Sequence, residues 1–317
     1  MLNVKLFGPG QAWYDEQPLA GFPQQQASLL LCYLLLHRPS PLHREHLASI
    51  FWPDYASPNA RKCLCNALWR LRQMLLSVGA DLDEYIFIHD ETISFRTTSS
   101  YLLDVDTFEG LANACLPVSA DELTVEQVER MEEGVHLYIG DLLESVYEDW
   151  CLYERERLHL MYLHILNKLM LYYGLMNQPL QGLVFGNRIL ASDPLQENVQ
   201  RQMMWLYWLA GDRNAALSQY KHCVQILWEE LKIRPMPETQ RLYEQILVNL
   251  VQPDEWLDQR TLLSSIEKKG EHDVENAALN HPVARRIKAL REMLEATQRE
   301  LRQIEKLIYE TGGETNF

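Results

Sequence analysis

Apolar positions in the first hundred residues change spacing several times, and the changes predict a domain of strands and helices. Val4-Lys-Leu-Phe alternates and then meets Gly8-Pro9-Gly10, which is typical of a short strand that ends in a turn. Apolar residues at three- and four-residue spacing then predict helices at about residues 23–38, 43–51 and 57–76. Prolines separate these segments, and proline is rarely tolerated inside a helix.

Alternation returns after the third predicted helix. Tyr85-Ile-Phe-Ile and Thr92-Ile-Ser-Phe-Arg are joined by His89-Asp90-Glu91, which is typical of a β-hairpin. Three helices followed by a hairpin are the element order expected of a winged helix-turn-helix.

The helix predicted at 57–76 combines an apolar stripe with a polar face. The apolar stripe consists of Ala60, Leu64, Leu68, Leu71 and Leu75. Long donors and amides are the side chains that reach phosphates and base edges. With one residue of the preceding helix, the candidates for contacts with DNA are Arg44, Asn59, Arg61, Lys62, Asn66, Arg70 and Arg72. The alternative is that these side chains form only the solvated face of an amphipathic helix.

Helical spacing continues through residues 122–250, with short turn signals between the segments. Gly174, Asp193-Pro194, Gly211-Asp212 and Pro235-Met-Pro237 divide the region into consecutive helices. Antiparallel helices with short turns are typical of a helical repeat such as the tetratricopeptide repeat, so this region is predicted to be TPR-like. We expect its aromatic residues to lie in the core between helices.

A heptad repeat follows Pro282 near the end of the chain. Its seam is Ile287, Leu290, Leu294, Thr297, Leu301, Ile304 and Ile308, and charged residues flank it. A narrow seam with charged flanks predicts a coiled coil, so we expect a homodimer held through all of these residues except Thr297. The alternative is that this helix packs back on its own chain.

Charge is informative only when it is counted by segment. The 317 residues carry a formal net charge of −15, which taken alone argues against a nucleic-acid binder. Residues 1–100 hold 8 basic and 9 acidic residues, whereas residues 101–250 hold 11 and 22. Residues 38–73 hold six basic and two acidic residues, a local charge of +4. The acidic total therefore does not exclude a DNA-binding module in the first hundred residues.

The cysteines, the apolar runs and the absence of a catalytic motif in the sequence exclude several other classes of protein. The six cysteines are scattered and only Cys63 and Cys65 lie close together, so we expect reduced, packed thiols in a cytoplasmic protein and no metal site. The longest unbroken apolar run, Leu29 to Leu36, is far shorter than the roughly 20 residues of a membrane span. Because the sequence shows no catalytic set and no phosphate-binding loop, we predict no enzymatic activity, no cofactor and no membrane contact.

Several motifs in order resemble one known family. The first set is similar to the OmpR/PhoB-type winged helix of the bacterial antibiotic-regulatory activators, the SARP proteins: His43-Arg44-Glu45-His46-Leu47, Phe51-Trp52-Pro53-Asp54 and Ala60-Arg61-x-x-Leu64-x-x-Ala67-Leu68-x-Arg70-Leu71-Arg72. The second set resembles the junction and the bacterial transcriptional activator domain of that family: Leu103-Asp104-Val105-Asp106-x-Phe108, Gly140-Asp141-Leu142-Leu143, Asp149-Trp150 and Asp193-Pro194-Leu195-x-Glu197. The resemblance extends over roughly residues 3–250.

The resemblance implies a transcriptional activator that binds double-stranded DNA at repeated promoter sites and contacts RNA polymerase. A second hypothesis stays open, because the predicted hairpin tip is acidic and the first hundred residues are nearly neutral. Under that hypothesis the chain is a TPR-like interaction adaptor whose winged helix no longer binds DNA.

The predicted fold is mainly α with a small β component. Residues 1–100 are expected to form the winged helix-turn-helix and residues 101–250 the TPR-like activator domain. An acidic linker at 251–281 and a coiled-coil helix at 282–311 complete the prediction.

Overall fold

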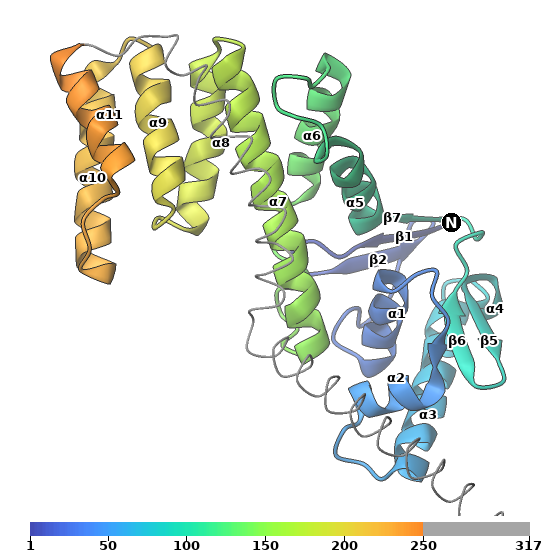
Figure 1. Ribbon diagram of the computed structural model, residues 1–317. Helices are drawn as coiled ribbons and strands as arrows, with labels where there is room; N and C mark the ends of the chain where they lie inside the picture. The colour runs from blue at the N-terminus through green and yellow to red at the C-terminus, as the bar shows by residue number, and fades with distance from the viewer. Residues whose placement is uncertain (250–317) are drawn as a thin grey trace, which may run out of the picture. The chain divides into compact units, whose positions relative to one another are not determined.

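The computed structural model describes residues 1–249, which are drawn in colour in Figure 1. The linker at 251–281 and the heptad helix at 282–311 lie outside the described residues, so both stay predictions. Within the described part, helices predominate and the strands form two small sheets, which confirms the predicted fold class.

A four-stranded sheet begins the chain and takes one strand from beyond the hairpin. Its order is β3-β2-β1-β7, with bounds β1 (Leu2–Lys5), β2 (Gln11–Tyr14), β3 (Gln17–Pro18) and β7 (Tyr101–Leu103). β1 pairs antiparallel with β2 and parallel with β7, a strand that no sequence pattern predicted. Residues just beyond position 100 therefore complete the N-terminal sheet, and the predicted domain boundary at 100–101 stays a prediction.

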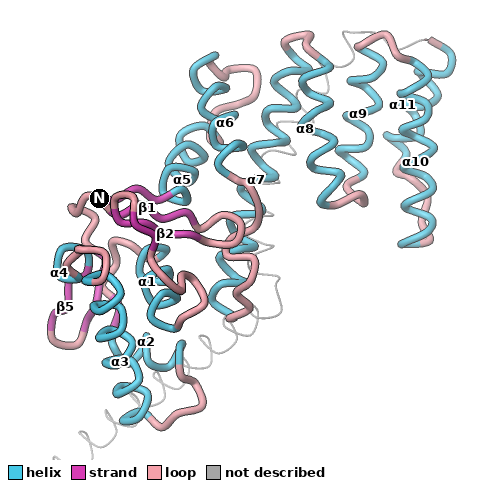
Figure 2. The backbone as a smooth tube through the Cα atoms, turned by 180° about the vertical axis from the view of Figure 1, so that it is seen from behind, coloured by secondary structure: helices cyan, strands magenta, loops and turns pink. Residues whose placement is uncertain are grey.

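The three predicted helices and the hairpin are confirmed and form the winged helix. The helices are α1 (Gln26–Leu36), α2 (Arg44–Phe51), α3 (Ser57–Leu76) and the short α4 (Leu82–Tyr85). The second sheet has the order β4-β6-β5, with bounds β4 (Leu42–His43), β5 (Ile86–His89) and β6 (Thr92–Phe95). Figure 2 shows α3 beside α4 and the strand β5.

Seven helices follow β7. They are α5 (Asp104–Cys115), α6 (Val125–Leu137), α7 (Asp149–Leu175), α8 (Pro179–Ser192), α9 (Glu197–Leu209), α10 (Arg213–Leu231) and α11 (Pro237–Val248). From α7 onward each helix packs against the next, as the sequence predicted, and Figure 1 shows them side by side. The assignment of this region as TPR-like stays a prediction. None of the described helices has both the length and the apolar content that a membrane crossing requires.

The aromatic residues of this region do not all lie in the core. Trp205 is 4% exposed, as expected for a core residue. The expectation is wrong for Trp228, which is 54% exposed. The buried residues of α10 are Ala216, Cys223 and Leu227, and Trp228 lies about 100° around the helix from Leu227, off that stripe.

Helix α1 is enclosed on every side. Nine of its 11 residues are buried, from Ala27 through Leu35. The Tyr33 ring meets Phe51 of α2 edge-on with 5.7 Å between centroids, and it meets Trp150 of α7 edge-on at 5.3 Å. A helix that is apolar all round must be covered all round. Helix α7, from the helical region that follows β7, therefore supplies part of the core of the winged helix.

Asp104 joins the start of α5 to the end of β1. Its carboxylate accepts hydrogen bonds from the backbone N–H groups of Leu6 at 2.9 Å, Phe7 at 3.0 Å and Val105 at 2.8 Å. Burial raises the pKa of the Asp104 carboxyl, and the same three N–H groups act in the opposite direction. The carboxylate thus satisfies backbone donors that the strand pairing of β1 leaves free.

We expect Asp104→Ala to lower the free energy of unfolding by about 2–4 kcal/mol. Three buried N–H groups would lose their acceptor, and each unsatisfied buried donor costs roughly 1–3 kcal/mol. Urea denaturation of the full chain measures the change. The control is Asp54→Ala, at an exposed position, which we expect to change stability by no more than about 0.5 kcal/mol. Equal losses in the two variants would contradict this role of Asp104.

Candidate nucleic-acid interface

Helix α3 has one buried face and one exposed face. The buried face is the predicted one, with Ala60, Leu64, Leu68, Leu71 and Leu75. The exposed residues on the opposite face are Asn59, Lys62, Asn66, Trp69, Arg70 and Gln73. Their spacing places them on one side of the helix, so amides, cations and one indole can meet a ligand together. Trp69 is 62% exposed near the middle of this face.

Two of the predicted DNA contacts are already paired with carboxylates. Arg61 forms an ion pair with Glu45 of α2. Arg72 lies 2.7 Å from the nearer Asp83 oxygen and 3.7 Å from Asp81. The hydrogen bond to Asp83 raises the pKa of the Arg72 guanidinium. Either arginine would have to leave its carboxylate to reach a phosphate, which lowers the net gain of such a contact.

Arg44 lies at the junction of helix and hairpin. Its backbone N–H donates to the Glu91 carbonyl at 2.8 Å, so the start of α2 is attached to the hairpin tip. The tip itself is acidic and exposed, with Asp90 at a φ of 33° and its carboxylate 3.6 Å from His89. The Arg44 side chain is half-buried and forms no ion pair with residues 1–249.

Arg96 is a cation that the sequence reasoning missed. It directly follows β6, and its guanidinium lies 4.7 Å from the centre of the Phe87 ring on β5. Stacking on an aromatic ring holds a guanidinium in place without neutralising it. Its position at the end of the predicted hairpin was the signal that could have marked it. Within the described residues, Lys62, Arg70 and Arg96 also form no ion pair.

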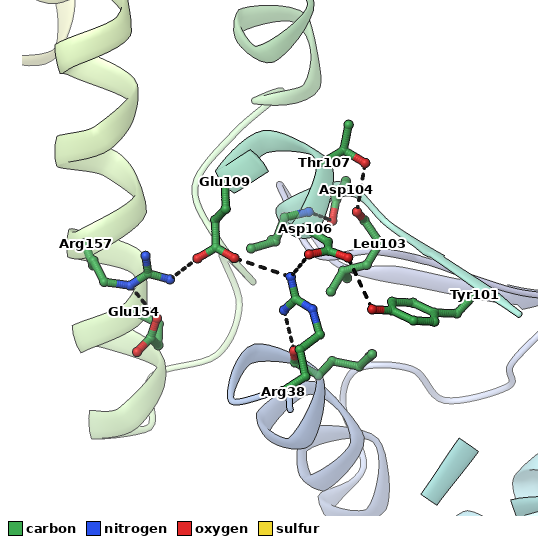
Figure 3. A network of polar contacts seen from close by, with 11 residues as sticks. Arg38, Tyr101, Leu103, Asp104, Asp106, Thr107, Glu109, Glu154 and Arg157 are labelled. Carbon is green, nitrogen blue, oxygen red and sulfur yellow. Dashed lines mark hydrogen bonds and ion pairs between the residues drawn. The ribbon is translucent and has the colours of Figure 1, made fainter. Parts of the chain in front are cut away.

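A network of ion pairs connects the end of α1 in the winged helix to α5 and α7 (Figure 3). Arg38, just after α1, lies 2.6 Å from Asp106 and 3.3 Å from Glu109, both on α5. The other oxygen of Glu109 lies 2.5 Å from Arg157 of α7, which also pairs with Glu154 at 2.8 Å. Burial acts to lower the pKa of the Arg157 guanidinium, but the two carboxylates raise it overall. Glu109 therefore bridges cations from two parts of the chain.

The segment between α6 and α7 forms a second connection to the N-terminal sheet. Gly8 N–H donates to the Asp141 carbonyl at 2.8 Å, and Leu143 N–H donates to the Leu6 carbonyl at 2.9 Å. Gly10 is required beside this segment, because its φ is +77° and an added Cβ would lie 2.6 Å from the Leu143 side chain. The two hydrogen bonds attach the segment that leads into α7 to the end of β1, and so fix the position of α7 against the winged helix.

His159 of α7 lies between Asp141 and Ser192, an arrangement that superficially suggests catalysis. Its Nε2 lies 3.0 Å from the Ser192 hydroxyl and its Nδ1 lies 3.4 Å from the Asp141 carboxylate. Ser192 is the last residue of α8, where the helix dipole is negative and disfavours a developing anion. The cluster therefore serves to tie the segment before α7 to the end of α8.

Comparison with known proteins gives consistent matches. Residues 103–247 match the bacterial transcriptional activator domain. The chain is 25% identical over 251 residues to regulatory protein AfsR of Streptomyces coelicolor, covering 78% of this chain and 24% of AfsR. It is 23% identical over 238 residues to transcriptional regulatory protein MoaR1 of Mycobacterium tuberculosis, covering 74% of this chain and 75% of MoaR1. The chain thus spans about a quarter of AfsR and three quarters of MoaR1.

The fold is similar to that of Mycobacterium tuberculosis EmbR, solved in complex with a low-affinity phosphopeptide. The TM-score is 0.66 at 17% identity, covering 87% of this chain and 69% of that chain. At this identity the likeness concerns the fold. The chain therefore combines a winged helix-turn-helix fold with a segment that matches the bacterial transcriptional activator domain. These matches agree with the resemblance of the motifs to the SARP family, and the relatives named here are regulatory proteins.

We expect Glu109→Ala to lower the free energy of unfolding by about 1.5–3 kcal/mol, the range for hydrogen bonds to charged groups. The Arg38 side chain is 7% exposed, so it cannot replace the lost carboxylate with bulk water. Urea denaturation measures the effect. Glu129→Ala on α6, at an exposed position, is the matched control and should leave stability nearly unchanged. If the two variants are equally stable, the bridge contributes nothing to holding the parts together.

Proposed function

We propose that this chain is a sequence-specific DNA-binding activator that inserts α3 into the major groove. The observation that carries the proposal is the exposed face of α3 with Asn59, Lys62, Asn66 and Arg70, since it offers amides for bases and cations for phosphates. Its position on the third helix of a winged helix matches the element that reads the groove in this fold. We therefore propose the predicted residues of α3 as the ones that contact DNA.

The cations divide into two groups under this proposal. Arg44, Lys62, Arg70 and Arg96 have no carboxylate partner within residues 1–249 and are available for phosphates. Arg61 and Arg72 must first leave Glu45 and Asp83, so they contribute less to affinity. The four unpaired cations would give one winged helix about four phosphate contacts, and these contacts would determine the electrostatic part of its affinity for DNA.

A single module with so few contacts binds weakly, which gives dimerisation a role in the proposal. Two modules linked through the heptad at 287–308 would bind repeated promoter sites with a raised effective concentration. The activator domain would then bring RNA polymerase to the promoter. The match to the bacterial transcriptional activator domain and the names of AfsR and MoaR1 as regulatory proteins support this proposal.

The double variant Lys62→Ala/Arg70→Ala tests the reading helix. We expect a loss of affinity for duplex DNA of about 10- to 100-fold, since each contact contributes roughly 1 kcal/mol or more. The slope of log affinity against log salt should fall from roughly −3.6 to roughly −1.8, because two of four phosphate contacts are lost. Fluorescence anisotropy with genomic fragments at several salt concentrations measures both quantities.

Arg72→Ala is the matched control, because it removes a charge from the same helix that is already paired with Asp83. We expect it to weaken binding much less than the double variant does. Unchanged affinity in the double variant would contradict the proposed reading face. Absent or salt-independent binding by the unaltered chain would favour the adaptor hypothesis, which the acidic hairpin tip and the two paired arginines motivate.

The double variant Leu294→Glu/Leu301→Glu tests the proposed dimer. Two charges in the seam should prevent association, so sedimentation should give half the mass of the unaltered chain. Binding to a DNA with two sites should weaken strongly, while binding to one site stays the same. Glu300→Gln, outside the seam, should behave as the unaltered chain. A monomeric unaltered chain, or a double variant that still dimerises, would overturn this part of the proposal.

A further inference from the structure

Trp69 is a large apolar side chain on the exposed face of α3. Its indole is 62% exposed, although tryptophan is highly buried on average in folded proteins. Ala67 and Leu71, two positions before and after it, are buried, and each lies about 160° from it around the helix. The indole therefore projects directly away from the core. Within residues 1–249 it takes part in no hydrogen bond and no ring contact.

The side chains beside Trp69 are not those of a surface that docks another protein. Its neighbours one turn before and after are Cys65, Asn66, Arg72 and Gln73, and none of them is large and apolar. Apolar patches that bind proteins or membranes extend over roughly several hundred Å² without interruption. The apolar area around this position is that of one indole, so it matches a small apolar target.

Unpaired cations on the same helix favour DNA as the molecule that carries this target. Lys62 lies two turns before Trp69 and about 20° from it around the helix, and Arg70 follows it directly. Neither cation forms an ion pair within residues 1–249. With this face turned to the major groove, the cations reach toward phosphates while the indole points at the base edges.

The base edges in the major groove present one apolar group, the C5-methyl group of thymine. Their other features are hydrogen-bond donors and acceptors. Contact between the indole and this methyl group removes apolar surface of both from water, which is favourable. We infer that Trp69 is a specificity-determining residue that recognises thymine through its methyl group. The inference rests on the proposed function and adds the base that one residue of α3 selects.

The first test removes the methyl group from the DNA and leaves the protein unaltered. A genomic fragment that the full chain binds is amplified once with thymidine triphosphate and once with deoxyuridine triphosphate. Uracil keeps the pairing and the charge of thymine and lacks only the C5-methyl group. We expect the uracil duplex to bind about fourfold more weakly for each methyl group contacted, the factor that burial of one methyl group gives. Fluorescence anisotropy with both duplexes measures the ratio.

Three variants of the full chain assign this preference to the indole. In Trp69→Ala the two duplexes should bind equally within about twofold, and comparison with the unaltered chain cancels any effect of uracil on DNA shape. Trp69→Phe should keep the preference, because phenylalanine also contacts the thymine methyl group. The matched control is Leu76→Ala, at the last residue of α3, where the side chain is 51% exposed and the preference should be retained.

The outcomes separate this inference from the proposed function. Equal binding of the two duplexes by the unaltered chain overturns the inference alone, because DNA is still bound. A preference that persists in Trp69→Ala overturns it as well, since another residue or the shape of the DNA then senses the methyl group. Loss of the preference in Trp69→Phe overturns it in favour of a hydrogen bond from the indole N–H. If the unaltered chain binds no DNA, the proposed function and the inference fail together.

Discussion

The burial of α1 is the constraint on which the rest of the structure depends. Its residues from Ala27 through Leu35 are buried on all sides, so no face of this helix can remain in water. Helix α3 and the strand β6 cover part of it, and Trp150 of α7 covers another part. Because the activator domain completes this core, the winged helix and α7 form one unit. Helix α3 is consequently held by the same framework as α7 and the helices that follow it.

Polar contacts give this packing its specificity. Apolar burial is non-directional and fixes no orientation between α1, α5 and α7. Glu109 does so, because its two oxygens meet guanidinium groups from either side. Asp104 and the carbonyls held by Arg155 add contacts at defined backbone positions. The orientation of α7 therefore follows from directional bonds.

The charge available on residues 38–73 differs most between what the sequence predicts and what the fold leaves unpaired. The segment 38–73 has a local charge of +4, yet Arg38, Arg61 and Arg72 each have a carboxylate partner in the fold. Two of these arginines pair with residues outside that segment, on α5 and at α4. The charge that remains unpaired in this segment is therefore smaller, and Lys62 and Arg70 place part of it on α3.

The sequence by itself determined the succession of helices, the hairpin and the polar face of α3, because these follow from local periodicity along one element. Its motifs also indicated the resemblance to the SARP family, with which the match at residues 103–247 agrees. Only the tertiary structure decided that β7 joins β1, that α1 is covered on all sides, and that Arg61 and Arg72 are neutralised. The same holds for Arg155 and Arg157 of α7, whose guanidinium groups are held by the Leu142 carbonyl and the Glu109 carboxylate. These features depend on residues distant in sequence, and the spacing along a single helix or strand carries no information about such partners.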